Sequence, residues 1–170
     1  MRTRDFEVFS NKSLRKGQKL LIVSCSAIKD PRPNLLSAIL RYSGEIYLLL
    51  KLVVFKNSWP QHVNLLIVSA KYGLLHPLDN IPYYDQALRP EKITELKKVV
   101  HEPIKKIDLT LYSEWFINLS KQYLQSIEEI ITVLKKNKCK IIIVDNEGFT
   151  KRNNTILTWL SQERTENKDH

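Results

Sequence analysis

Residues 19–26, KLLIVSCS, and residues 64–70, NLLIVSA, decide the fold of this chain. Each is a short apolar run that ends in small residues, which is typical of a strand buried on both faces of a parallel sheet. A third run, KIIIVD at 140–145, has the same character. Because helical segments separate the three runs, the sequence predicts an α/β fold with a largely parallel central sheet and helices on both faces.

Apolar spacing and boundary residues predict the first three helices. LLSAILRY at 35–42 is interpreted as a short helix closed by Gly44, and a second helix is predicted over 45–56. Pro90 suits the first turn of a third helix, because a proline there loses no hydrogen bond. We expect this helix to end near His101, since Pro103 follows.

The carboxyl-terminal half is predicted to contain the longest helix. Apolar residues recur every three or four positions from Tyr112 to Lys136, which is the spacing of an amphipathic helix. Asn153 or Asn154 is the predicted N-cap of a last helix.

Length and composition predict one folded domain. The chain has 170 residues, of which 43% are hydrophobic and 26% charged, and this composition excludes general disorder. We expect a basic, flexible segment over 1–18, a single domain over 19–163 and a frayed tail over 164–170.

The sequence predicts a cytoplasmic protein without a metal or a cofactor. Cys25 and Cys139 lie far apart, and neither belongs to a CxxC or Cys/His spacing that would indicate zinc. The apolar runs are shorter than the roughly 20 residues of a membrane span, so we expect no membrane partner. Residues 1–18 have no apolar signal core.

The charge indicates a polyanionic partner, because a basic face attracts phosphates. Lys and Arg outnumber Asp and Glu by 27 to 18, which gives a net charge of +9. Such an excess attracts polyanions. Solvated lysines on helix surfaces explain the same numbers, so the charge alone names no ligand.

Polar residues directly after the first strand form one candidate site. In α/β sheets ligands bind beyond the carboxyl ends of the strands. Ser24, Cys25, Ser26 and Lys29 occupy that position. Cys25 is a candidate nucleophile and Lys29 a candidate charged catalytic group, although an inert packed thiol and a solvated loop lysine remain alternatives.

The segment after the second strand forms the other half of the candidate site. It is a long stretch without periodicity, and loops of this length are usually functional. Lys71 is a candidate catalytic group, and Tyr72 and Tyr84 are candidate platforms for a base, or residues that pin the loop to the core. Asp79 and Asp85 are candidate acids, bases or ligands of a base edge, or residues of Asx turns. The ligand-binding candidates here also include Ser69 and Gly73.

Three segments of the chain resemble the YaaA-like superfamily. They are LLIVSCSAIKD at 20–30, RYSGEIY at 41–47 and VSAKYGLLHPLDNIPYYDQAL at 68–88. The resemblance is closest to a branch with CSxxK, Tyr-x-Gly and SAKxGLL motifs, and it adds Tyr42 and Gly44 to the ligand-binding candidates. His76 stands where the peroxide-stress proteins of the superfamily have an arginine.

The resemblance implies a link to nucleic acid or nucleobases. One branch of the superfamily binds DNA under oxidative stress. The archaeosine synthase family has a loop reminiscent of 25–29 and acts on a deazapurine base in transfer RNA. We therefore expect an enzyme that modifies or transfers a purine-like base, with a non-catalytic DNA-binding protein as the alternative. If there is a shared site, six side chains should converge on one concave surface: Cys25, Lys29, Tyr42, Ser69, Lys71 and Asp85.

Overall fold

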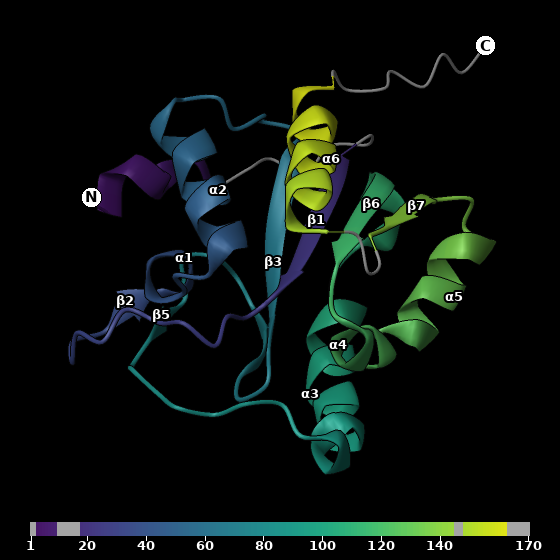
Figure 1. Ribbon diagram of the computed structural model, residues 1–170. Helices are drawn as coiled ribbons and strands as arrows, with labels where there is room; N and C mark the ends of the chain where they lie inside the picture. The colour runs from purple at the N-terminus through teal and green to yellow at the C-terminus, as the bar shows by residue number, and fades with distance from the viewer. Residues whose placement is uncertain (1–2, 10–17, 145–147, 163–170) are drawn as a thin grey trace.

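The computed structural model describes residues 3–9, 18–144 and 148–162. The central sheet consists of β1 (Gln18–Ser24), β3 (Val63–Ser69), β4 (Gly73–Leu75), β6 (Tyr112–Asn118) and β7 (Lys140–Ile143). Its strand order is β4-β3-β1-β6-β7 (Figure 1). All neighbours pair in parallel except β4, which is antiparallel to β3. The predicted α/β fold with a largely parallel sheet is therefore confirmed.

Helices cover both faces of the sheet. One face packs against η1 (Thr3–Phe9), α1 (Ala38–Arg41), α2 (Glu45–Phe55) and α6 (Phe149–Ser161). The other face packs against α3 (Ile93–Lys105), α4 (Lys121–Gln125) and α5 (Glu128–Lys136). Smaller elements complete the chain: β2 (Leu36–Ser37), β5 (Asn80–Ile81), η2 (Pro90–Lys92) and η3 (Leu109–Leu111).

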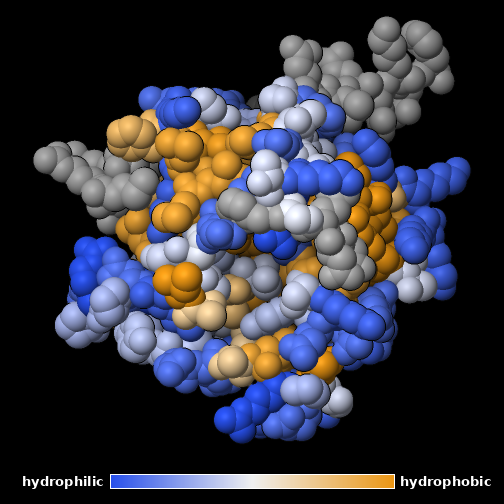
Figure 2. All heavy atoms as spheres, viewed as in Figure 1, coloured by the Kyte–Doolittle hydropathy of each residue, from blue (hydrophilic) through white to orange (hydrophobic). Residues whose placement is uncertain are grey.

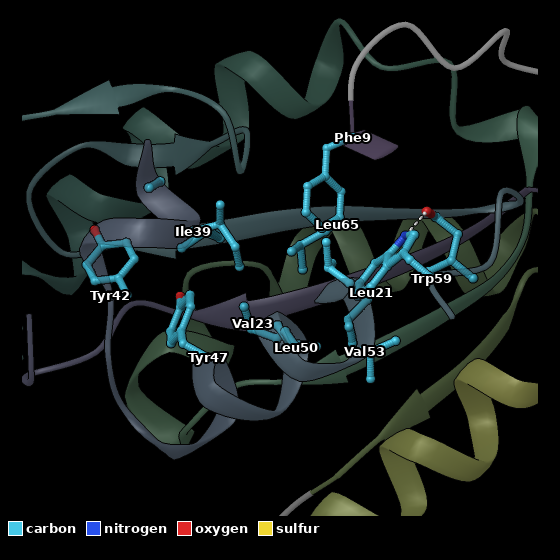
Figure 3. Close-up of a cluster of buried hydrophobic side chains, with 14 of the residues drawn as sticks. Phe9, Leu21, Val23, Ile39, Tyr42, Tyr47, Leu50, Val53, Trp59 and Leu65 are labelled. Carbon is cyan, nitrogen blue, oxygen red and sulfur yellow. Dashed lines mark hydrogen bonds between the residues drawn. The ribbon is translucent and has the colours of Figure 1, made fainter. Parts of the chain in front are cut away.

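The apolar run of β1 supplies both cores at once. Leu21 and Val23 point into the core under α2, where Figure 3 shows them beside Leu50, whereas Leu20 and Ile22 join the core under α3 and α5. Successive side chains of a strand point to opposite faces, so a strand covered on both faces must be apolar throughout.

The outer side of α2 is also apolar. Tyr47 and Leu50 face the core, but Leu48, Leu52 and Phe55 are exposed. Figure 2 shows hydrophobic side chains gathered over this part of the molecule. The helix over 45–56 was nevertheless predicted within one residue of its end, because it has no internal glycine or proline.

The prediction of one long helix over 112–136 is wrong. Residues 112–118 form β6, and the helical part is divided into α4 and α5. Trp115 packs in one core and Phe116 in the other, which is the alternation of a buried strand. The run of apolar residues at helical spacing continues into this strand only by coincidence.

Other helix boundaries also differ from the sequence-based predictions. Gly44 is the N-cap of α2 and does not close the preceding helix, which spans only Ala38–Arg41. Asn153 and Asn154 lie inside α6, whose N-cap is Gly148. A helix whose N-cap is glycine, with no side chain to cap it, is harder to recognise in a sequence than a helix capped by asparagine.

The third helix, α3, continues through Pro103 to Lys105. Because proline has no N–H, the Val99 carbonyl loses its usual donor four residues later. The same carbonyl approaches Gly73 of β4, where a Cβ atom would lie 3.0 Å from its oxygen. Gly73 also has a φ of 71°, so glycine is favoured there both because the backbone is left-handed and because a Cβ atom would crowd the Val99 carbonyl.

The core includes side chains that precede Lys19, where the sequence places the start of the domain. Phe6 and Phe9 of η1 are buried, and the Phe9 ring meets Trp59 edge to face at 4.9 Å. The predicted tail at 164–170 and Asp145 of the third apolar run lie outside the described residues. Within the described part of the chain, no helix is both long and apolar enough to cross a membrane.

Candidate functional site

The strand order creates a switch point between β1 and β6. The chain passes from β1 to β3 on one side, and later returns to form β6 on the other side of β1. Both connections leave the carboxyl ends of these strands at the same edge, because all three strands are parallel. In doubly wound sheets this edge is where ligands bind.

Three hydroxyl groups meet beyond the ends of β1 and β3. The Tyr42 hydroxyl lies 2.6 Å from that of Tyr84 and donates to Ser69 Oγ at 3.3 Å. Ser69 Oγ and the Tyr84 hydroxyl are 3.1 Å apart. All three residues are buried, and we call them the hydroxyl cluster. The cluster lies at the carboxyl end of β3, because Ser69 is the last residue of that strand.

Two lysines flank this cluster. Lys29 Nζ lies 4.6 Å from the centre of the Tyr84 ring, and Lys71 Nζ lies 5.2 Å from it, which are cation–π distances. A β-bridge between Lys29 and Tyr42 places the first lysine. The turn after β3 places the second, because the Lys71 N–H donates to Ser69 Oγ at 3.3 Å.

The Cys25 thiol lies beside Tyr84 of the hydroxyl cluster and beside Tyr123. Cys25 follows directly after β1, and its Sγ is 3.2 Å from the Tyr123 hydroxyl of α4. The Tyr47 hydroxyl donates to the Ser24 carbonyl at 2.8 Å and so holds the end of the strand. Cys25 and Cys139 are both free thiols.

The tyrosines near Cys25 are neutral hydrogen-bonding groups. Burial raises the pKa of Tyr84 to about 12. Burial also raises the pKa of Tyr42 and Tyr123 above that of an ordinary phenol. At neutral pH these hydroxyls therefore both donate and accept hydrogen bonds, and none of them supplies a phenolate base.

A hollow of about 500 Å³ opens at the switch point itself. The carboxyl end of β1 lines it through residues 24–27, and the end of β6 lines it through residues 118–121. The first residues of α2, Gly44, Glu45 and Ile46, form a further wall. The remaining lining residues are Val144 and Arg152.

The wall formed by α2 presents free backbone N–H groups. Gly44 makes no side-chain cap, and a helix start leaves its first N–H groups without intrahelical partners. A Cβ atom at Gly44 would collide with Ser26 Oγ, so glycine allows the loop after β1 to approach the helix. Ser26 Oγ accepts from the Ile28 N–H at 3.1 Å, which leaves its own proton available.

Asn118 is the most unusual lining residue. It is only 8% exposed, yet its side-chain amide has no hydrogen-bond partner among the described residues. Arg152 Nε is likewise buried without a partner in the described part of the chain. Buried polar groups are almost always hydrogen-bonded, so the Arg152 Nε requires an explanation, and the Asn118 amide is left to bond whatever occupies the hollow.

The structure brings together most of the predicted site residues. Cys25, Lys29, Tyr42, Ser69 and Lys71 lie around Tyr84, whereas the sequence predicts one concave surface shared by these five residues and Asp85. Of those six only Cys25 lines the adjacent hollow, together with Ser24, Ser26 and Gly44. Tyr72 joins the group around Tyr84, since its ring meets that of Tyr84 edge to face at 5.1 Å.

Three predicted residues have a different environment. Tyr84 is 5% exposed, so its ring packs within the cluster and the half-buried Tyr72 is the more accessible platform. Asp79 accepts from the His76 N–H at 2.7 Å, so it stabilises a turn, but through a residue three positions earlier and not through the Asx geometry expected from the sequence. Asp85 is exposed and makes no contact with the hydroxyl cluster among the described residues.

Four residues of the site were missed from the sequence. Asn118, Lys121 and Tyr123 lie in the helix predicted over 112–136, and Arg152 was counted only among the basic residues that could attract phosphates. The signal was present in WFINLSK at 115–121, an apolar run that ends in Asn, Ser and Lys as the first strand ends in Ser, Cys and Ser.

The loop that carries Lys29 has its own ion pair, which gives a testable prediction. Asp30 accepts from Arg32 Nε at 2.9 Å and from the Arg32 backbone N–H at 3.0 Å. These hydrogen bonds lower the pKa of Asp30 to about 2. Its folded pKa lies below the unfolded value of 3.8, so its contribution to stability is present above that value and is lost as the pH falls towards 2.

Replacing Arg32 by alanine should raise the pKa of Asp30 towards, but not up to, 3.8, because the backbone N–H of residue 32 remains. Carboxyl-detected NMR titration of both proteins measures this difference. An Asp30 pKa that stays near 2 in Arg32→Ala would assign the shift to another group.

Comparison of the chain with protein-family models, curated proteins and solved structures finds no match. The resemblance to the YaaA-like superfamily therefore stays a prediction.

Proposed function

We propose that this protein binds a nucleobase or nucleotide at the carboxyl edge of its sheet and is an enzyme that modifies or transfers a purine-like base. The observation that carries the proposal is the convergence of Lys29, Lys71 and the Cys25 thiol around the hydroxyl cluster. These groups come from three separate segments of the chain, after β1, before Tyr42 and after β3.

The chemistry of the cluster suits a planar, polar ligand. Tyr72 offers part of an aromatic face, and hydroxyl groups that donate and accept can bind the edge of a base. The ammonium groups of Lys29 and Lys71 can stabilise negative charge that develops on the base. In this proposal one of these lysines is the charged catalytic group and Cys25 is the candidate nucleophile.

Titration calorimetry with purine bases, nucleosides, nucleotides and short transfer RNA fragments tests the site. We expect Lys29→Ala and Lys71→Ala each to weaken binding at least about tenfold, since hydrogen bonds to charged groups contribute on that scale. The exposed Lys136 of α5 provides the matched control, Lys136→Ala, which should bind as the wild type does. Undiminished binding in both site variants, with unchanged folding, would reject the assignment.

The net charge of +9 favours a second function, non-catalytic binding to DNA. In that case the logarithm of affinity should fall with the logarithm of salt concentration by about 0.9 for each phosphate neutralised. Binding would also survive Lys29→Ala and Lys71→Ala. A flat salt response would remove this alternative.

A further inference from the structure

We propose that the hollow between β1 and β6 is a subsite for a phosphate monoester, which makes a mononucleotide the ligand class of this protein. The nucleotide identity rests on the proposed function, whereas the phosphate subsite rests on the hollow alone. Four observations support it: its place in the fold, its unpartnered buried groups, its charges and its connection to Cys25.

The place of the hollow is that of a ligand site in an open parallel sheet. It lies beyond the carboxyl ends of β1 and β6, the two neighbouring strands between which the chain reverses direction. Its volume of about 500 Å³ is within the range of small-molecule sites. A hollow of this kind accommodates a single nucleotide more readily than a duplex.

The unpartnered groups indicate that a ligand completes the hollow. Asn118 is more than nine-tenths buried, lines the hollow and has no side-chain hydrogen bond among the described residues. Because no side chain or backbone group of the described residues bonds this amide, a water or a ligand in the hollow has to supply its hydrogen bonds. The Nε of Arg152, another lining residue, is fully buried and has no partner in the described part of the chain.

The charges select an anion. Lys121 and Arg152 line the hollow, and neither forms an ion pair within the described residues. Glu45 is the single carboxylate among the described lining residues, and it is exposed. The uncapped start of α2, an eleven-residue helix, adds backbone donors and the positive end of its dipole.

A phosphate monoester matches these donors better than a carboxylate does. It accepts several hydrogen bonds at once, here from the Ser26 hydroxyl, the Asn118 amide, Arg152 and the N–H groups at the start of α2. Glu45 at the same wall is suited to accept from a sugar hydroxyl. Cys25 lines the hollow and also lies against the tyrosines, so one ligand can reach both places.

The decisive variant is Asn118→Leu, which keeps the side-chain volume and removes the amide. We expect its binding of inorganic phosphate and of a nucleoside 5′-monophosphate to fall at least about tenfold, because a donor to an anion is lost. We expect its melting temperature to stay equal or to rise, because an unpartnered polar group no longer has to be buried. A structural asparagine would instead lower the melting temperature when replaced.

Arg152→Gln is the second variant, measured by calorimetry with inorganic phosphate, the free base, the nucleoside and the nucleoside monophosphate. It should weaken the two phosphate-bearing ligands at least about tenfold and leave the free base unchanged. Lys29→Ala should weaken all ligands that carry the base but not inorganic phosphate. This pattern separates the phosphate subsite from the base site.

Each result decides one of the two proposals. Unchanged phosphate and monophosphate affinity in both Asn118→Leu and Arg152→Gln, or no phosphate binding by the wild-type protein, overturns the subsite. Phosphate binding that depends on Asn118 and Arg152 without any binding of bases or nucleosides supports the subsite and rejects the proposed function.

Discussion

Replacing Glu114 by alanine should lower the free energy of unfolding by about 3–5 kcal/mol, the usual cost of removing one partner from a buried ion pair. Glu114 is 3% exposed, and its Oε1 accepts from Trp159 Nε1 at 2.7 Å. Its carboxylate lies 3.9 Å from Lys19 Nζ and 3.2 Å from Lys140 Nζ. Alanine leaves the Lys19 ammonium, which is 1% exposed, buried without its counter-charge.

Strand register explains why these three charges meet. Lys19 pairs with Glu114 across β1 and β6, and Glu114 pairs with Lys140 across β6 and β7. The three residues lie near the starts of their strands, at the edge of the sheet opposite the candidate site. Substitutions here should therefore change stability and leave ligand affinity intact in the folded protein.

Urea denaturation followed by circular dichroism measures the effect, with Lys140→Ala as the matched control. The Lys140 side chain is 64% exposed, so its removal should cost no more than about 1 kcal/mol. Lys19→Met combined with Glu114→Leu should recover only part of the loss, because apolar groups replace the buried pair but Trp159 Nε1 stays without its acceptor. A loss below about 1 kcal/mol in Glu114→Ala would show that Lys19 finds another partner or reaches water.

The strands that the sequence predicted correctly are those whose central residues are selected by burial alone. In β1 and β3 the central residues, LLIV at 20–23 and LLIV at 65–68, lie between two covered faces, so hydrophobicity selects each of them and the two runs are uninterrupted. In β6 two causes act, because the same strand also holds Glu114 in the ion-pair network and Asn118 at the hollow. These polar residues shorten the apolar run, and Trp115 happens to continue the helical spacing of the next segment.

This misassignment explains which half of the site was foreseen. The strand ends at Ser24 and Ser69 were located from the sequence, so the lysine, cysteine and tyrosine side chains near them were proposed as one group. The wall formed by β6 and α4 was hidden inside a predicted helix, and with it the hollow at the switch point. Strand order also lay beyond the sequence pattern, because pairing of β6 with β1 depends on contacts 95 residues apart in the chain, such as Ser113 with Gln18.

Arg41 was not singled out from the sequence, yet its replacement by methionine should have the second largest effect. Arg41 is fully buried, and its guanidinium donates to the backbone carbonyls of Asp30, Arg32, Asn34 and Ile81. These bonds hold the loop over 30–34 and hence the adjacent Lys29. We expect stability to fall by about 3 kcal/mol, because several hydrogen bonds from a charged donor are lost and the part-buried carbonyl acceptors are only partly re-solvated.

The same substitution should weaken ligand binding at least about tenfold, since Lys29 no longer stays over the Tyr84 ring. Hydrogen exchange should show faster exchange at the backbone N–H of Asp30, which donates to the Arg41 carbonyl at 2.7 Å. Arg32→Ala is the control, because it removes a neighbouring guanidinium but keeps the carbonyl to which Arg41 donates. Wild-type exchange rates and affinity in Arg41→Met would mean that the β-bridge between Lys29 and Tyr42 holds the loop by itself, and that the buried guanidinium acts on stability alone.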